Sequence, residues 1–327
     1  MVALIVSVPS GAVFFNPAFL SVSRAATTTT VGAPHARRSG GEEAGILPVR
    51  QRGAQRASTQ RSARLVVFAF VAVFAMALGA AANPAATAAA GKKVVIVVGP
   101  AGSSTADYRS SARTYASVAR SYGANVIEIY SPYATWSRVR AAAQGANVFI
   151  YLGHGNGYPS PYGAFRSVTM DGLGLNATSG NGNYNVRYWG EYYITHYIRF
   201  ARNAVVILNR LCYASGNSEW GSANPTKSTA IRRVDNFGAG FLRANARAVF
   251  AEAITSVSYT IRALFTSTRT MDAIFMNHPS ASGARDFWFS SVRTPGYRAH
   301  LDPPLAGKYW RSVIGTLTMT ATTFRAG

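Results

Sequence analysis

Two side chains in the sequence have the chemistry of a nucleophile and its base, and each follows an apolar run. His154 follows VFIYLG, and Cys212, the single cysteine of the 327 residues, lies just beyond AVVILN. A thiol attacks as its thiolate, and a nearby imidazole can take the thiol proton and later return it to a leaving amine. His154 and Cys212 are therefore the candidate catalytic residues.

Glycines surround both candidates, in the strings GHG and CYASG. Because glycine has no side chain beyond Cα, main-chain amides at these places can approach a reacting carbonyl group closely. The N–H groups of Gly155 and Cys212 are the predicted oxyanion hole. The alternative interpretation is structural, since a His-Gly pair can simply form a turn and lone cysteines are often buried and inert.

Strands must position these residues, and the chain from residue 91 alternates strand-like with helix-like segments. Short apolar runs predict strands over residues 92–98, 125–130, 147–153, 203–209, 246–252 and 312–324. Helical spacing predicts helices over residues 105–122, 134–143, 191–201, 229–244 and 258–276. A long loop rich in Gly and Asn lies between residues 155 and 190.

This alternation indicates a mostly parallel sheet of about six strands with helices on both faces, in one α/β domain over residues 91–327. Functional groups of such a sheet gather at the carboxyl ends of its strands, and sequential strands often lie side by side. We therefore expect His154 and Cys212 to face the same crevice.

The two motifs, YLGHG around His154 and CYASG from Cys212, each placed after an apolar strand, resemble those of the caspase-like cysteine peptidases. That clan includes metacaspases, gingipains, clostripain and CHAT domains. The resemblance extends from residue 92 to about residue 320 through the order of strands and helices, although only these two motifs are specific. It implies a three-layer sandwich and an endopeptidase in which His154 is the base and Cys212 the nucleophile; together with the export signal described below, this predicts a secreted endopeptidase.

Two departures from the family bear on the substrate. Metacaspases carry an Asp two residues before the Cys, which helps to hold a basic substrate side chain, and this chain has Arg210 there. The Ser-Gly pair also follows Cys212 one residue later than in the usual C-x-S-G. Arg210, which would favour an acidic side chain, and Glu219 are the pocket candidates, while Asp235 and Glu252 are further carboxylates near the crevice. The alternative function is an inactive caspase-like module that binds the envelope or another protein.

Metal and cofactor motifs are mostly excluded. One cysteine cannot build a Cys-rich zinc or iron–sulfur site, and H-E-x-x-H, Walker and G-x-S-x-G motifs are absent from the sequence. The string DGLGLNA from Asp171 matches a dinucleotide fingerprint, but no helix pattern follows it. We expect no metal and no cofactor, with Ca²⁺ at Asp171 and its Asn-rich loop as the one alternative.

The net charge of +21 divides along the chain. Residues 1–64 contribute +6 and read as a disordered basic leader, and residues 91–327 contribute +15. The uncharged segment 65–90 predicts a secretory signal peptide or an uncleaved anchor. Arginine outnumbers lysine 29 to 4, a bias typical of GC-rich bacterial genomes, so the true start could be Val49 read from a GTG codon.

These features predict a secreted or cell-envelope protein, with residues after 91 outside the cytoplasm. The expected partners are a protein or peptide substrate and, for the basic surface, anionic cell-envelope polymers. Nucleic acid is disfavoured because the arginines are dispersed without a basic-aromatic motif. A membrane is a partner only if segment 65–90 stays uncleaved.

Overall fold

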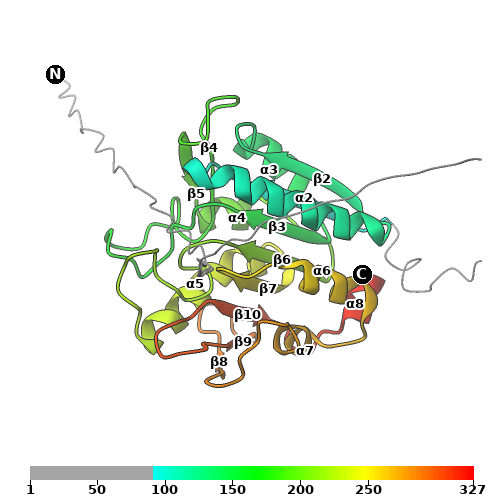
Figure 1. Cartoon of the computed structure of the whole chain (residues 1–327), viewed down its shortest axis with the longest axis vertical. Coiled ribbons are helices and arrows are strands. Elements are labelled where there is room, and N and C mark those ends of the chain that lie inside the picture. Colours follow the sequence, from blue (N-terminus) through cyan, green and yellow to red (C-terminus); the bar gives the residue numbers. More distant parts are fainter. Residues whose placement is uncertain (1–90) are drawn as a thin grey trace, which may run out of the picture. The chain divides into compact units, whose positions relative to one another are not determined.

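The computed structural model describes residues 91–327, which form an eight-stranded sheet with helices on both faces (Figure 1). The predictions for residues 1–90, namely the leader, the start at Val49 and the signal peptide or anchor, lie outside the described residues. Within residues 91–327, no helix combines the length and the hydropathy needed to cross a bilayer.

Five parallel strands form the centre and one edge of the sheet, in the order β2-β1-β3-β6-β7. Their bounds are Lys93–Val98 for β1, Asn125–Tyr130 for β2, Val148–Leu152 for β3, Ala204–Asn209 for β6 and Ala246–Glu252 for β7. All except the edge strand β2 are apolar and almost wholly buried, as parallel strands covered on both faces must be. The predicted α/β class and parallel sheet are confirmed.

Three antiparallel strands complete the sheet beyond β7. They are β10 (Arg311–Gly315), β9 (Arg298–Leu301) and β8 (Phe287–Ser290). The sheet thus has eight strands where about six were expected, because β8 and β9 have four residues each, too few for a clear apolar pattern. The predicted strand over 312–324 ends at Gly315, and α8 (Ala321–Ala326) follows, capped by Thr320, whose hydroxyl accepts the Thr323 N–H.

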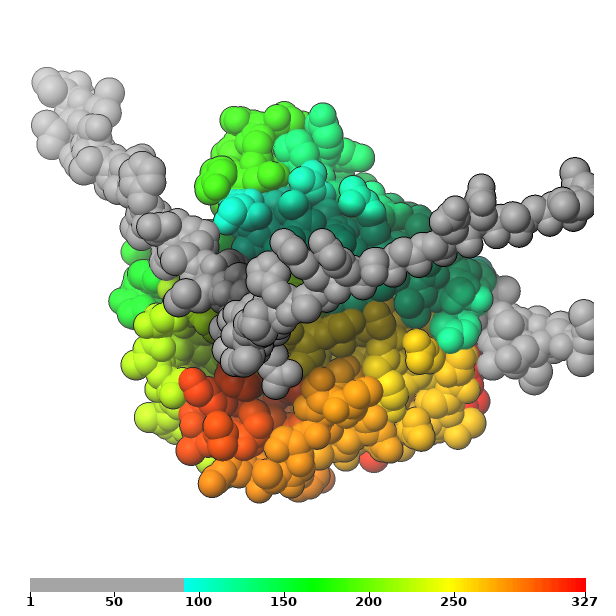
Figure 2. Space-filling view, viewed as in Figure 1, coloured from blue at the N-terminus to red at the C-terminus, as the bar shows by residue number. Residues whose placement is uncertain are grey.

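Helices cover both faces and fill two separate cores. The helices α3 (Trp136–Ala143), α4 (Glu191–Tyr197) and α5 (Lys227–Arg243) pack on one face. The other face carries α2 (Thr105–Ser121), which follows a short 3₁₀ turn η1 (Gly102–Ser104), together with α6 (Ser258–Thr266), α7 (Met271–Met276) and α8. In Figure 2 the teal surface of the α2 region lies above the yellow and orange surface of the α6 and α7 region.

Two further differences from the sequence predictions concern local structure. The single helix expected over 258–276 is two helices, because the Thr270 side chain caps a new helix by accepting the Ala273 N–H. The long loop after His154 contains an antiparallel pair, β4 (Leu173–Asn176) and β5 (Val186–Trp189), outside the main sheet.

Candidate active site

Cys212 lies three residues beyond β6, in a turn with an unusual backbone. Arg210 and Tyr213 have φ of +62° and +70°, in the left-handed region that residues other than glycine rarely adopt. The turn is held by hydrogen bonds from the Arg210 N–H to the Glu252 carbonyl oxygen (2.9 Å) and from the Ala214 N–H to the Cys212 carbonyl oxygen (2.9 Å). The half-buried thiol therefore lies at the carboxyl edge of the sheet.

His154 lies two residues beyond β3, the strand that pairs with β6 in parallel. The backbones of the two loops are in contact, since a Cβ on Gly155 would lie 2.0 Å from the Cys212 carbonyl oxygen. Any side chain at position 155 would push the loops apart. No hydrogen bond joins the imidazole of His154 to the thiol of Cys212 within residues 91–327. The contact between the two loops is the one between the main chains of Gly155 and Cys212.

The hydroxyl of Tyr151 anchors the His154 loop. It accepts the Gly174 N–H (2.9 Å) and lies 3.0 Å from the His154 carbonyl oxygen and 2.8 Å from that of Gly174. A Cβ on Gly153 would lie 2.4 Å from the same oxygen, so the glycine before His154 makes room for the hydroxyl. Complete burial raises the pKa of Tyr151 well above its usual range and keeps the hydroxyl protonated.

Asp171 ties down the far end of the same loop. Its Oδ1 accepts the Tyr158 N–H (3.1 Å), its own N–H donates to the Asn156 carbonyl oxygen (2.7 Å), and its Oδ2 has no hydrogen-bond partner. Burial raises the pKa of this carboxyl well above its usual range.

The surroundings of Asp171 do not fit Ca²⁺, which takes six to eight oxygen ligands. The carboxylate of Glu191, whose charge acts on Asp171, is paired with Arg243 and Arg293. Among the described residues, no group of three or more His, Cys, Asp or Glu side chains could hold a metal ion. No step of the chemistry below therefore involves Ca²⁺.

Glu219 lies beside both candidate catalytic residues. Its two oxygens accept hydrogen bonds from the hydroxyls of Tyr162 (2.6 Å) and Tyr213 (2.8 Å). Burial and, to a smaller extent, the charge of Glu219 together raise the pKa of the Cys212 thiol to about 11, and the main chain of Trp220 and the charge of Arg233 act in the opposite direction.

The imidazole of His154 is shifted in the opposite direction. Desolvation lowers its pKa below the ordinary 6.5, and the charge of Glu219 partly offsets this effect. The resting site therefore holds a neutral thiol and a neutral imidazole at pH 7, rather than an ion pair.

Arg210 flanks the site on the side of α2. Its guanidinium lies 5.9 Å from the centre of the Tyr108 ring, and its Nε is buried without a hydrogen-bond partner. The thiol of Cys212 and the guanidinium of Arg210 act on the pKa of Tyr108 in opposite directions, which places that phenol near both. Of the two pocket candidates, Glu219 contacts Tyr162 and Tyr213 and its charge acts on both the thiol and the imidazole, whereas Arg210 contacts Tyr108.

Arg233 of α5 is a residue that the sequence did not single out. Its Nη1 donates to the Asn217 carbonyl oxygen (2.7 Å) and its Nε to that of Pro159 (2.8 Å), so it joins the loops that follow Cys212 and His154. Its guanidinium also lies 4.6 Å from the centre of the Tyr213 ring. The pair Arg232-Arg233 in the sequence has no feature that distinguishes this buried arginine from its exposed neighbour.

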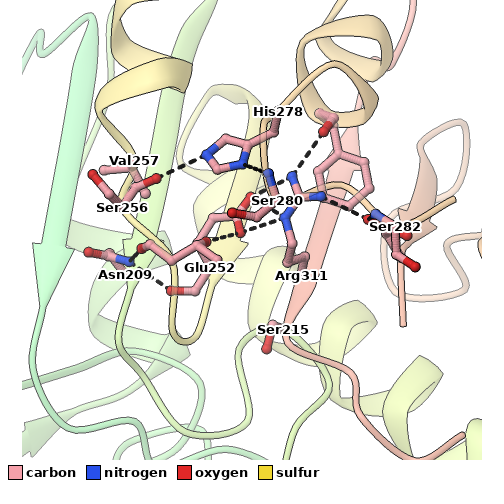
Figure 3. Close-up of polar contacts among 12 residues, drawn as sticks. Asn209, Ser215, Glu252, Ser256, Val257, His278, Ser280, Ser282 and Arg311 are labelled. Atoms are coloured by element: carbon pink, nitrogen blue, oxygen red, sulfur yellow. Dashed lines mark hydrogen bonds and ion pairs between the residues drawn. The ribbon is translucent and has the colours of Figure 1, made fainter. Parts of the chain in front are cut away.

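A buried ionic network includes Glu252 and Arg311 (Figure 3). Arg311 pairs with Glu252 (Nε to Oε2, 2.8 Å) and with Asp302 (Nη1 to Oδ2, 2.8 Å), and all three side chains are almost fully buried. The carbonyl oxygen of Glu252 accepts both the Arg210 N–H and the Asn209 side-chain amide (2.9 and 2.8 Å). The network thus reaches the backbone that leads into Cys212.

The remaining candidates from the sequence have other contacts. Asp235 accepts the N–H groups of Val292 (3.0 Å) and Arg293 (3.1 Å), and Glu252 belongs to the ionic network. The buried His300 of β9 has its ring nitrogens 2.7 and 3.0 Å from carboxylate oxygens of Asp272 and Asp286.

No protein-family model matches the sequence, and no curated protein matches it. Among solved structures, one chain of the Saccharomyces cerevisiae separase–securin complex is similar, with a TM-score of 0.27 and 14% sequence identity. The match covers 53% of this chain and 9% of that chain. A likeness at this level does not identify a family, so the function proposed next rests on the fold and on the residues of the site.

Proposed function

We propose that this chain is a caspase-like cysteine endopeptidase that hydrolyses peptide bonds through Cys212 and His154. The observation that carries the proposal is the contact between Gly155 and the Cys212 turn, at the carboxyl ends of the adjacent strands β3 and β6. That contact supports the presence of a nucleophile, a base and two main-chain N–H donors in one place, as acyl transfer requires.

In this mechanism, Sγ of Cys212 attacks the peptide carbonyl carbon while His154 accepts the thiol proton. The N–H groups of Gly155 and Cys212 stabilise the oxyanion. The intermediate collapses to a thioester as the imidazolium protonates the leaving amine. Water, deprotonated by His154, then attacks the thioester and releases the acid and the free thiol.

Glu219 and Arg210 are proposed to contact the substrate side chains. The exposed Tyr162 hydroxyl covers one oxygen of Glu219, and a substrate group could displace it. We also propose, from segment 65–90, that the enzyme is secreted or held at the cell envelope, where it cleaves a protein or peptide.

Cleavage of a peptide library by the full chain tests the proposal. Cys212→Ala and His154→Ala should each lower kcat/KM by roughly 10² or more, because one removes the nucleophile and the other the base. Wild-type protein alkylated at Cys212, its single cysteine, is the matched control for Cys212→Ala. Equal cleavage by wild type and Cys212→Ala would refute the thiol mechanism, and a folded wild type that cleaves no peptide would favour the inactive module.

The pH profile provides a second test. Since the pKa of His154 is lowered and the base must be neutral, kcat/KM should rise with pH through a value below 6.5 and stay level toward pH 8. An optimum that falls again between pH 6 and 8 would instead indicate a thiolate–imidazolium pair, contrary to the neutral resting state.

A further inference from the structure

The described surface is more basic than its net charge suggests. Asp107 is the one exposed carboxylate side chain of residues 91–327, whereas sixteen lysines and arginines of this range are exposed. The other carboxylates are buried or half-buried, many in the bonds described above. A ligand therefore meets cationic groups with few anionic ones beside them.

One part of this surface also carries aromatic rings, and we call it the aromatic–arginine face. It lies on α3, β5 and the short helix α4. Its aromatic members are Trp136, Trp189, Tyr192, Tyr193 and Tyr197. Its exposed cationic members are Arg140, Arg187 and Arg199.

The rings form a continuous row across the three elements. Trp136 and Trp189 stack at 5.0 Å between centroids, and Tyr193 meets Trp189 edge-on at 4.6 Å and 78°. Tyr197 lies 6.0 Å from Tyr193 and is 43% exposed. The guanidinium of Arg187 lies 4.4 Å from the centre of the Trp189 ring.

The side chain of Gln144 links the two helices of this face. The side-chain amide of Gln144 donates to the carbonyl oxygens of Arg140 (2.9 Å) and Tyr197 (2.7 Å) and accepts the Arg199 N–H (3.1 Å). This bridge joins the ends of α3 and α4 through the main chains of Arg140, Tyr197 and Arg199. Glu191, the acidic residue of α4, is buried in its ion pairs and leaves the face without an exposed carboxylate.

We propose that the aromatic–arginine face binds an acidic polysaccharide. Guanidinium groups pair well with carboxylates, and aromatic rings with a polar tip can pack on the apolar faces of sugar rings while tyrosine hydroxyls bond to sugar hydroxyls. Single-stranded nucleic acid, whose bases would stack on the same rings, is the competing ligand that the binding test separates from polysaccharide.

This binding is separate from the proposed catalysis, since the face includes neither Cys212 nor His154. Polysaccharide bound there would hold the enzyme at an anionic matrix and leave the thiol free for a protein substrate. The face also gives a location to the anionic polymers expected from the charge of residues 91–327.

Isothermal titration calorimetry at low salt, which measures the binding of polygalacturonate to the full chain, tests this proposal. Neutral dextran and single-stranded oligo(dT) are the comparison ligands. The double variant Arg140→Gln/Arg187→Gln should raise the Kd for polygalacturonate roughly tenfold, because two charge-assisted contacts are lost. The matched control, Arg113→Gln/Arg262→Gln, removes the same charge from α2 and α6 on the other face of the sheet. It should change the Kd less than about twofold.

Tyr197→Leu separates the aromatic contribution from charge, and should weaken polygalacturonate binding several-fold at constant net charge. Circular dichroism and thermal unfolding show whether each variant is folded. Equal weakening by the control pair would overturn the proposal by showing non-specific attraction. Tighter binding of oligo(dT), no binding of polygalacturonate, or an unchanged Kd in folded Tyr197→Leu would overturn it as well.

Discussion

The loop that carries His154 and the turn that carries Cys212 meet at one edge of the sheet, but the groups that hold them differ in kind. The His154 loop is anchored by uncharged groups, namely the Tyr151 hydroxyl with its glycine neighbours. The Cys212 turn is backed by charged groups, with Arg311 between Glu252 and Asp302. Both supports are buried, so the contrast lies in charge rather than in access to solvent.

Because the supports differ in charge, substitutions can disturb the two halves of the candidate site separately, with unequal losses of stability. Removing a hydroxyl leaves a buried amide without a partner, whereas removing a guanidinium leaves buried charges without compensation. Disrupting the ionic network of Arg311 should therefore lower the free energy of unfolding more than removing the Tyr151 hydroxyl does. Removing that hydroxyl should mainly change the position of His154.

The largest effect is expected from Arg311→Met. Two buried carboxylates would lose their shared partner, so the free energy of unfolding should fall by about 3–5 kcal/mol. Urea denaturation of the variant and wild type measures the change. Arg243→Met is the matched control, since Arg243 is partly exposed and Glu191 keeps Arg293, and should cost less than about 1 kcal/mol. If Arg243→Met lowered the free energy of unfolding as much as Arg311→Met, the buried ionic network would have no special role in stability.

A smaller effect, about 1–3 kcal/mol, is expected from Tyr151→Phe, which leaves the Gly174 N–H without an acceptor. Tyr115→Phe is the control, because Tyr115 is equally buried and its hydroxyl donates to Asn209 (2.9 Å) on the Cys212 side. Nuclear magnetic resonance of the histidines should show a changed His154 signal in Tyr151→Phe alone. The same change in both variants would show that the two supports are not independent.

The smallest change in stability, less than about 1 kcal/mol, is expected from Glu219→Gln, since this residue is partly exposed. The variant tests whether one charge links the two halves of the site, because the carboxylate of Glu219 raises the pKa of both Cys212 and His154. Removing it favours the thiolate, so the pKa of Cys212 should fall from about 11. The pH dependence of iodoacetamide alkylation reports on this single thiol, and Tyr162→Phe, which keeps the charge, should shift it less.

The same shift has a consequence for stability at alkaline pH. A thiol pKa raised from 9.0 to about 11 means that the unfolded chain loses its proton first as pH rises. The thiol therefore opposes folding progressively between about pH 9 and pH 11, and Glu219→Gln should lose less stability over this range. An identical alkaline decline in the variant and wild type would contradict the effect assigned to Glu219.

Sequence patterns predicted the strands, because a strand is specified by residues that are close together in the sequence. The apolar runs located β3, β6 and β7 almost to the residue, and parallel pairing of β3 with β6 then brought His154 near Cys212. The supports were not predicted. Tyr151 reads as one more apolar strand residue, and Arg311 meets Glu252 only through antiparallel pairing of β10 with β7, 59 residues away in the chain.

The high pKa of Cys212 also has a consequence for the durability of the protein. Peroxides and disulfides react with thiolates, so a thiol that stays protonated at neutral pH is oxidised slowly. No second cysteine exists in the chain to trap it as an intramolecular disulfide. Outside the reducing cytoplasm, where we propose that the protein works, its one sulfur would persist in reduced form between encounters with substrate.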